Sequence, residues 1–128
     1  MKIEIAAICD AAKEYGTRLN LLGALDLVRA PQVPFVIRHL DVVCRVRLEA
    51  AEEGNHDASV SLIDGDGERI MDDIHIGFGV GNAPGLASAA ANVLLPLDNI
   101  TIPQHGEYSL DISIDGVPKV SLPLHVVP

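Results

Sequence analysis

The stretch EYSLDISIDGVPKVSLPLHV, residues 107–126, decides the fold class of this chain. On both sides of the pair Asp115-Gly116, apolar residues occupy alternate positions: first Tyr108, Leu110, Ile112 and Ile114, then Val120, Leu122, Leu124 and Val126. Two alternating runs around an Asp-Gly pair indicate a β-hairpin. Pro123 has no N–H to donate, which predicts that its strand lies at a sheet edge or carries a bulge there.

The same period-two alternation recurs upstream. Residues 40–49 alternate between apolar and charged side chains and predict a strand. Residues 58–63 and 69–80 flank the turn-forming stretch DGDGE at 64–68, and this arrangement predicts a second hairpin.

Three further segments are expected to be strands. Residues 2–9 predict a first strand, and residues 93–102 predict another that is broken near Asp98-Asn99. Residues 19–28 are apolar on both faces around Gly23, which indicates a central strand or a bulge.

Together these segments predict an all-β fold. No long amphipathic helix separates the runs, which favours an immunoglobulin-like, two-sheet antiparallel β-sandwich of about 7–9 strands. Residues 1–128 are expected to form a single domain of this kind. Two short segments, 10–15 and 85–92, could form helical turns, and neither is long enough to be stable alone.

Tyr108 carries a more specific signal. It follows Gly106 at the entry to a strand, and this spacing resembles the tyrosine corner of immunoglobulin-like sandwiches, where the hydroxyl bonds to upstream backbone. The alternative is an ordinary core tyrosine after a turn.

Composition excludes several classes of partner. Eighteen acidic residues against nine basic ones give a net charge of −9, a field that repels nucleic acid and anionic membranes. The chain has only four aromatic residues and no Trp, too few to form a stacking platform for bases or sugars. Residues 1–10 lack a signal-peptide core, so a cytoplasmic location is expected.

The two cysteines, Cys9 and Cys44, fall on positions predicted to face inward on different strands. In a reducing compartment they are expected to be buried free thiols, and a disulfide between them is the alternative.

Several of these stretches also resemble a known family. They are residues 7–12 (AICDAA), 19–23 (LNLLG), 84–86 (PGL), 106–116 and Pro123-Leu124. The resemblance is to a family of small bacterial proteins of about this length, catalogued only as a domain of unknown function. It implies a bacterial β-sandwich and supplies no catalytic residue.

Two sets of residues could bind metal. Asp64, Asp66 and Glu68 alternate with glycines and could offer oxygens to Ca²⁺, although Asp and Gly also suit a plain hairpin turn. His39 and Asp41 share one strand face, and Asp73 and His75 share another. If those strands were neighbours, the four side chains could bind Zn²⁺, and otherwise they are polar groups on solvated faces.

Two further features could serve binding. Arg45 and Arg47 could bind an acidic partner, or could pair with the surface carboxylates Glu49, Glu52 and Glu53. Residues 81–91 form a long connection of small residues, either a binding loop or a crossover between sheets packed down by Leu86.

No catalytic motif stands out, and no cofactor is expected. The sequence therefore favours a protein-interaction or assembly module without catalysis, acting on a protein partner or by self-association as a homodimer. Apolar residues expected to point outward, Val43, Ile63 and Val127, support this interpretation. The alternative is a domain that binds calcium, zinc or a small ligand, and an enzyme is the least favoured class.

Overall fold

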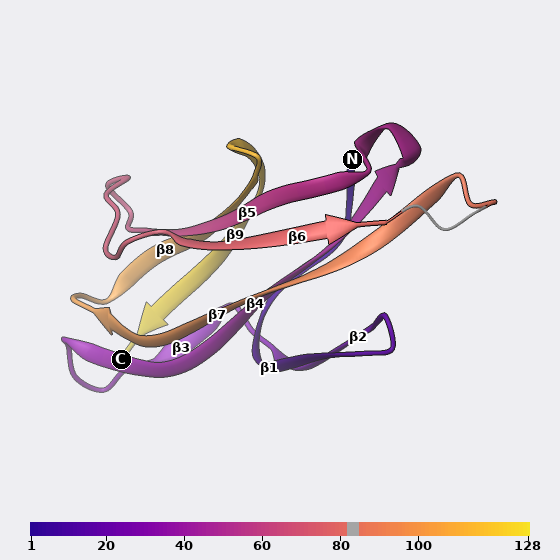
Figure 1. The fold of residues 1–128 in the computed structure, drawn as a ribbon. Helices are drawn as coiled ribbons and strands as arrows, with labels where there is room; N and C mark the ends of the chain where they lie inside the picture. The colour runs from indigo at the N-terminus through magenta and orange to yellow at the C-terminus, as the bar shows by residue number, and fades with distance from the viewer. Residues whose placement is uncertain (82–84) are drawn as a thin grey trace.

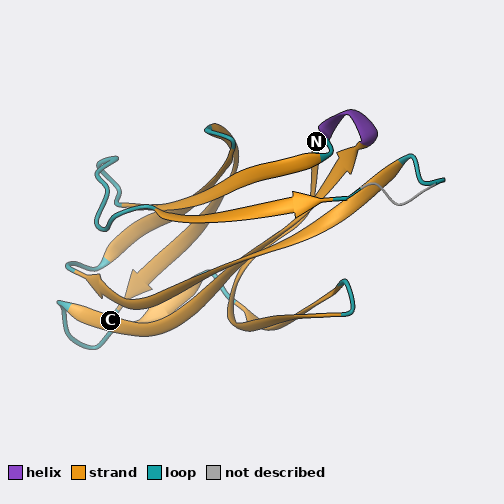
Figure 2. Ribbon diagram, in the orientation of Figure 1, coloured by secondary structure: helices purple, strands orange, loops and turns teal. Residues whose placement is uncertain are grey.

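The computed structural model describes residues 1–81 and 85–128, and within these ranges it contains nine strands in two sheets (Figures 1 and 2). The four-stranded sheet has the order β2-β1-β4-β7 and the five-stranded sheet the order β3-β9-β8-β5-β6. The elements are β1 (Lys2–Tyr15), β2 (Arg18–Ala24), β3 (Leu27–Arg29), β4 (Phe35–Glu49), the 3₁₀ turn η1 (Ala50–Glu52), β5 (Gly54–Ile63), β6 (Ile74–Val80), β7 (Ser88–Ile102), β8 (Gly106–Ile114) and β9 (Val117–Val127).

The core lies between the two sheets, which confirms the predicted sandwich. Alternate residues of each central strand point into it and are almost fully buried, among them Val42, Cys44, Val46, Leu95, Leu97, Val60, Leu62, Leu110 and Ile112. Burial of one such aliphatic side chain contributes roughly 1.5–3 kcal/mol. The period-two alternation is therefore a direct consequence of one face of each sheet being dry.

The β8–β9 hairpin has the predicted turn. Asp115 (φ 53°) and Gly116 (φ 78°) both adopt left-handed backbone, as the two central residues of a type I′ turn must. Pro123 lies opposite Ser109 of β8, and β3 pairs with β9 only at residues 125–127. Pro123 therefore lies on an edge, as its missing N–H predicted.

The tyrosine corner is also confirmed. The Tyr108 hydroxyl donates a 2.7 Å hydrogen bond to the backbone oxygen of Gln104, and the ring is 6% exposed. Beside it, the ring Nε2 of His105 lies 2.7 Å from the backbone oxygen of Ala30. These contacts fix the loop before β8 against Ala30, which lies in the connection from β3 of one sheet to β4 of the other.

Both predicted helical turns are wrong. Residues 10–15 belong to β1, where they pair with β2, and residues 88–92 belong to β7, where they pair with β4. The alanines in these segments favour helix on their own, but cross-strand hydrogen bonds and packing override that preference.

Residues 19–28 do not form a central strand. They divide between β2, an edge strand of one sheet, and β3, an edge strand of the other, after Gly23 in left-handed backbone (φ 70°). The short β3 runs parallel to β9, an exception to the otherwise antiparallel arrangement.

The connection from β6 to β7 passes from one sheet to the other, as the crossover interpretation required. Residues 82–84, including Pro84, lie outside the described residues. Leu86 is 59% exposed, so the expectation that it packs the crossover down is wrong. In the hairpin before it, β6 begins at Ile74 rather than at Arg69, which forms only an isolated bridge with Ile63.

Candidate functional site

The second half of β1 and all of β2 form a hairpin, residues 10–24, here called the arm. β1 pairs with β4 as far as Cys9 opposite Asp41, and beyond that point it pairs with β2 alone. In Figure 1 the arm diverges from the sandwich at the lower right, beside β4 and β7. The arm is therefore a two-stranded extension of the sheet that is supported on one side only.

The register divides the arm into two faces, because residues directly opposite each other on paired strands share a face. The contact face contains the pairs Ala12–Leu21 and Glu14–Leu19, and its three apolar side chains are half-buried. The exposed face contains the pairs Ala11–Leu22, Lys13–Asn20 and Tyr15–Arg18, and all six of these residues are exposed.

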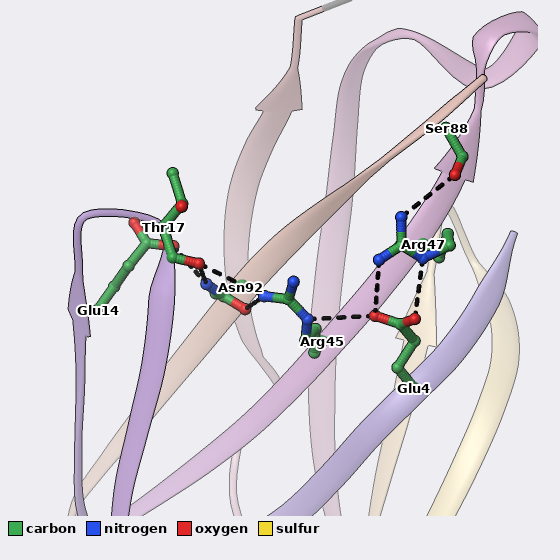
Figure 3. A network of polar contacts seen from close by, with 7 residues as sticks. All are labelled: Glu4, Glu14, Thr17, Arg45, Arg47, Ser88 and Asn92. Carbon is green, nitrogen blue, oxygen red and sulfur yellow. Dashed lines mark hydrogen bonds and ion pairs between the residues drawn. The ribbon is translucent and has the colours of Figure 1, made fainter. Parts of the chain in front are cut away.

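A network of polar contacts holds the tip of the arm to β4 and β7 (Figure 3). The Asn92 side-chain amide donates to Glu14 Oε2 at 2.8 Å and to the backbone oxygen of Thr17 at 2.9 Å. Its Oδ1 accepts a 2.8 Å hydrogen bond from Arg45 Nη1. Since Arg45 and Asn92 lie opposite each other on β4 and β7, both strands contact the arm.

The network continues to Glu4 of β1. Its carboxylate lies between two guanidinium groups, 3.1 Å from Arg45 Nε and 2.8 Å from Arg47 Nε. The hydrogen bond from Arg47 lowers the pKa of Glu4. Arg45 and Arg47 are thus engaged in ion pairing, one of the two alternatives that the sequence offered, although their partner is Glu4 rather than Glu49, Glu52 or Glu53.

The base of the arm is tied to β4 by Asp41, which is 8% exposed. Its Oδ2 accepts a 2.8 Å hydrogen bond from the backbone N–H of Ala12, and its Oδ1 lies 3.0 Å from His39 Nε2. The other ring nitrogen of His39, Nδ1, lies 2.7 Å from Asp98 Oδ1. The hydrogen bond that Asp98 accepts from His39, and then the one that Asp41 accepts, raise the pKa of His39, which favours a doubly protonated ring between the two carboxylates.

The arm also explains why Val43 is buried. By register Val43 lies opposite Ala7 and Leu94, on the side of β4 that faces away from the core, yet it is 0% exposed. The prediction that it points to solvent is wrong, because the arm lies over that side. Ile63 and Val127, the other two residues expected to be outward and apolar, are half-buried.

The exposed face of the arm combines apolar and cationic groups. Tyr15 is 71% exposed and Leu22 73%. Among the described residues, Lys13 and Arg18 have no carboxylate within ion-pair distance, whereas Arg45, Arg47 and Arg69 each have one. This face can offer an aromatic ring, an aliphatic side chain and two unpaired positive charges to a partner.

Comparison with known families agrees with the resemblance in the sequence. The model described as "Family of unknown function (DUF6941)" matches residues 4–127. The chain belongs to the DUF6941 family. No curated protein matches its sequence.

One solved structure, "The structure of a beta-glucuronidase from glycoside hydrolase family 2", is similar to the DUF6941 chain with a TM-score of 0.40 and 14% identity. The similarity covers 72% of this chain and 11% of that chain. Separately, none of the described DUF6941 residues lies in a helix long and apolar enough to cross a membrane.

The predicted calcium ligands of the DUF6941 chain lie in the turn between β5 and β6. Asp64 Oδ1 accepts hydrogen bonds from the backbone N–H groups of Asp66 and Glu68, both at 2.9 Å, so this carboxylate closes the turn. Asp66 and Glu68 are exposed. In the described part of the chain, no three His, Cys, Asp or Glu side chains are grouped to hold a metal ion. A calcium site at this turn stays a prediction.

The structure does not bring together the four residues considered for zinc. His39 and Asp41 lie on β4 of one sheet. His75 lies on β6 of the other sheet, and Asp73 is the residue immediately before β6. His75 instead lies 3.1 Å from Asp57, and Asp73 pairs with Arg69 at 3.0 Å. The condition that the strands be neighbours is not met, so these four residues are polar groups on separate sheets, the alternative given for them in the sequence analysis.

Both cysteines of the DUF6941 chain are free and buried. Cys44 points into the core, where burial raises its pKa to about 11. Cys9 lies opposite Asp41 and faces away from the core, so the expectation that both point inward is wrong for Cys9. Burial also raises the pKa of Cys9, and its thiol contacts the backbone oxygen of Asp41 at 3.5 Å.

Sequence reasoning missed the exposed face of the arm. The sequence allowed a helical turn over residues 10–15, and a helix would separate Ala11, Lys13 and Tyr15. A usable signal was present, because the two runs 11–15 and 18–22 flank Gly16-Thr17 as hairpin strands flank a two-residue turn.

Proposed function

We propose that this protein is a protein-interaction module that binds its partner through the exposed face of the arm and performs no catalysis. The observation that carries the proposal is the exposure of Tyr15 and Leu22. Among the described residues they are the two most exposed large hydrophobic side chains, at 71% and 73%. They lie on one face of one hairpin, with Ala11 opposite Leu22.

The chemistry of these side chains suits a binding surface. Single exposed apolar residues are normal on proteins, but apolar residues grouped on one face frequently mark interaction sites. On the exposed face, the Lys13–Asn20 pair separates Tyr15 from Leu22. Tyrosine is enriched among the residues that dominate binding energy, because it buries a large amphipathic area with few rotatable bonds.

The contacts beneath the arm support the same proposal. Asn92, Arg45 and Asp41 hold the contact face of the arm against the sandwich at both its tip and its base. A surface that is already ordered loses less conformational entropy on binding. The polar network therefore presents the exposed face in a fixed geometry.

A cytoplasmic location is also part of the proposal. Cys9 and Cys44 are both free, and by register they point to opposite faces of one sheet. Buried free thiols suit a reducing compartment. Cell fractionation with an antibody to the protein tests this, and recovery from an oxidising compartment would contradict it.

The double variant Tyr15→Ser/Leu22→Ser tests the interaction surface. Tagged wild type, this variant and the control Leu86→Ser/Val117→Ser, which removes two exposed apolar side chains elsewhere, are each used for affinity capture from the native host. Quantitative mass spectrometry should find a partner that the control retains and the arm variant loses. A stoichiometric partner that all three retain equally would show that the arm is not the binding surface.

A further inference from the structure

We infer that the partner of the arm is an extended acidic peptide segment that adds to the free edge of β2 as a further strand. This inference rests on the proposed function and deepens it, because it specifies both the chemistry and the conformation of the bound segment. Two independent features of the arm carry it: the segregation of charge between its faces, and the unprotected edge of β2.

Charge is separated by face within the arm. Its cations, Lys13 and Arg18, lie on the exposed face, and no acid is present among the six residues of that face. Its acids, Asp10 and Glu14, alternate with those positions along β1 and so point to the other face. Glu14 is also engaged by Asn92.

The exposed face is therefore positive although the chain has a net charge of −9. At an ionic strength of about 0.15 M the Debye length is about 8 Å, so a bound peptide interacts mainly with the nearest charges. Carboxylates on the peptide would be the complementary groups for Lys13 and Arg18.

The edge of β2 provides a backbone for pairing. β2 is the terminal strand of its sheet, and in the described ranges only β1 pairs with it. Edge strands usually carry a device that prevents strand addition, such as proline. The edge strand β7 contains Pro96, and the open edge of β9 carries Pro118 and Pro123, whereas residues 18–24 contain no proline. The other edge strands without proline are β3, which has only three residues, and β6, which contacts β7 of the other sheet.

Strand addition would place alternate peptide side chains over the exposed face of the arm, since side chains alternate along a strand. An apolar residue would lie beside Leu22, and an acidic residue would lie toward Arg18. On the side that lies over the exposed face, the bound segment is thus expected to carry an acidic and an apolar residue four positions apart, because Arg18 and Leu22 are four positions apart on β2.

A second copy of this chain fits the site less well. Pairing of two arms along β2 would place Lys13 and Arg18 of both copies on one continuous face, where like charges oppose each other. An anionic membrane would extend over the acidic body of the protein as well as the arm, and would be repelled by it.

The test is a selection from a displayed library of random peptides of about ten residues, a length that matches a typical strand. The target is the intact protein, and bound clones are compared with the unselected library. Enrichment of peptides with an acidic and an apolar residue four positions apart is expected. Peptides made from the selected clones are then measured against Lys13→Ser/Arg18→Ser and against the control Arg38→Ser/Lys119→Ser. The control removes the same charge from exposed positions outside the arm.

Loss of two exposed ion pairs should weaken binding by roughly tenfold in the arm variant and much less in the control. Binding by the wild type should also weaken between about 0.01 M and about 1 M salt, as screening increases. Methylation of those peptide backbone nitrogens that donate to the β2 edge should abolish binding, whereas methylation of the alternate nitrogens should not.

Each contrary result has a distinct meaning. Selected peptides that lack acids but need Tyr15 and Leu22 would overturn the acidic partner and leave the proposed function standing. Peptides that bind equally well to Tyr15→Ser/Leu22→Ser would overturn both, and a selection that enriches no peptide would overturn the peptide partner. Concentration-dependent dimerisation lost in the arm variant would identify a second copy as the occupant. Binding to vesicles of phosphatidylserine in phosphatidylcholine would identify a membrane.

Discussion

Asp41 of β4 accepts a 2.8 Å hydrogen bond at Oδ2 from the backbone N–H of Ala12, and this contact helps to tie the base of the arm to the sheet. The other oxygen of this carboxylate, Oδ1, lies 3.0 Å from His39 Nε2. Asp41 is 8% exposed, so both oxygens are used in a position with little access to water. The exposed and contact faces of the arm are oriented by this attachment together with Asn92 at the tip.

The variant Asp41→Ala should therefore be destabilised. It leaves the Ala12 N–H and one ring nitrogen of His39 without their acceptor, and loss of a part-buried acceptor of this kind costs about 1–3 kcal/mol. Urea unfolding followed by circular dichroism measures the change in the free energy of unfolding. Asp41→Asn is the matched control, because the amide oxygen can still accept one of the two hydrogen bonds. Equal stability of Asp41→Ala and wild type would contradict the assigned role.

Asn92→Ala should loosen the tip of the arm without disturbing the core. Asn92 bridges Glu14 and Thr17 to Arg45, and the contact that Arg45 Nη1 itself makes with the Thr17 backbone oxygen is longer, at 3.5 Å. Hydrogen exchange should therefore accelerate at amides of residues 14–20 and stay unchanged at the centres of β4 and β7.

Asn20→Ala is the control for this change, because among residues 1–81 and 85–128 the Asn20 side-chain amide bonds only within the arm, to the backbone oxygen of Arg18 at 3.3 Å. Its exchange pattern should match that of the wild type. If exchange in the arm were equally fast in wild type and Asn92→Ala, the network would not restrain the tip.

The sandwich could be predicted from sequence because its signals are local. Alternation along residues 107–126 indicates that one face of these strands is buried. Asp115-Gly116 specifies the turn, because both residues can adopt the left-handed backbone that the turn requires. The hydroxyl contact of Tyr108 reaches only to Gln104, four residues upstream. None of these features depends on which strand pairs with which.

The arm could not be predicted because its contacts are distant in sequence. Asn92 meets Thr17 across a separation of 75 residues, and Glu4 meets Arg47 across 43. Alternation shows that Val43 faces away from the core, but it does not show that another part of the chain covers that side. The ion pairs of Arg45 and Arg47 with Glu4 likewise depend on β1 lying next to β4 in the sheet.

Tyr108→Phe should cost about 1 kcal/mol of stability, since it removes one hydrogen bond from a buried ring and keeps its packing. The midpoint of urea unfolding should fall while its slope stays constant. Tyr15→Phe is the control, and its stability should stay within about 0.5 kcal/mol of wild type because that ring is exposed. A larger loss in Tyr15→Phe than in Tyr108→Phe would contradict the corner.

A pH dependence is expected from His56 of β5. Its Nδ1 lies 2.6 Å from Asp115 Oδ2, and its Nε2 lies 2.6 Å from the backbone oxygen of Glu52. Both nitrogens face acceptors, so the doubly protonated ring fits the site best. The hydrogen bond with Asp115, followed by that with Glu52, raises the pKa of His56 in the folded protein.

The raised pKa fixes the sign of the effect. The unfolded chain has the ordinary histidine pKa of about 6.5, so the folded protein binds this proton more tightly. The contribution of His56 is fully present below about pH 6.5 and is lost as pH rises through the higher pKa of the folded state. The same pair lowers the pKa of Asp115, whose contribution is lost as pH falls through that lowered value.

Asp115→Asn isolates this interaction, because asparagine tolerates the left-handed backbone at φ 53° and its side-chain oxygen can still accept the 2.9 Å hydrogen bond from Asp57 N–H. In an NMR titration the pKa of His56 should fall toward the ordinary value in this variant. Urea unfolding should show the wild type losing stability relative to Asp115→Asn as pH rises above about 6.5. His39 titrates in both proteins, so its effect cancels in the difference. A stability difference that stays constant through this range would show that His56 holds no extra proton in the folded state.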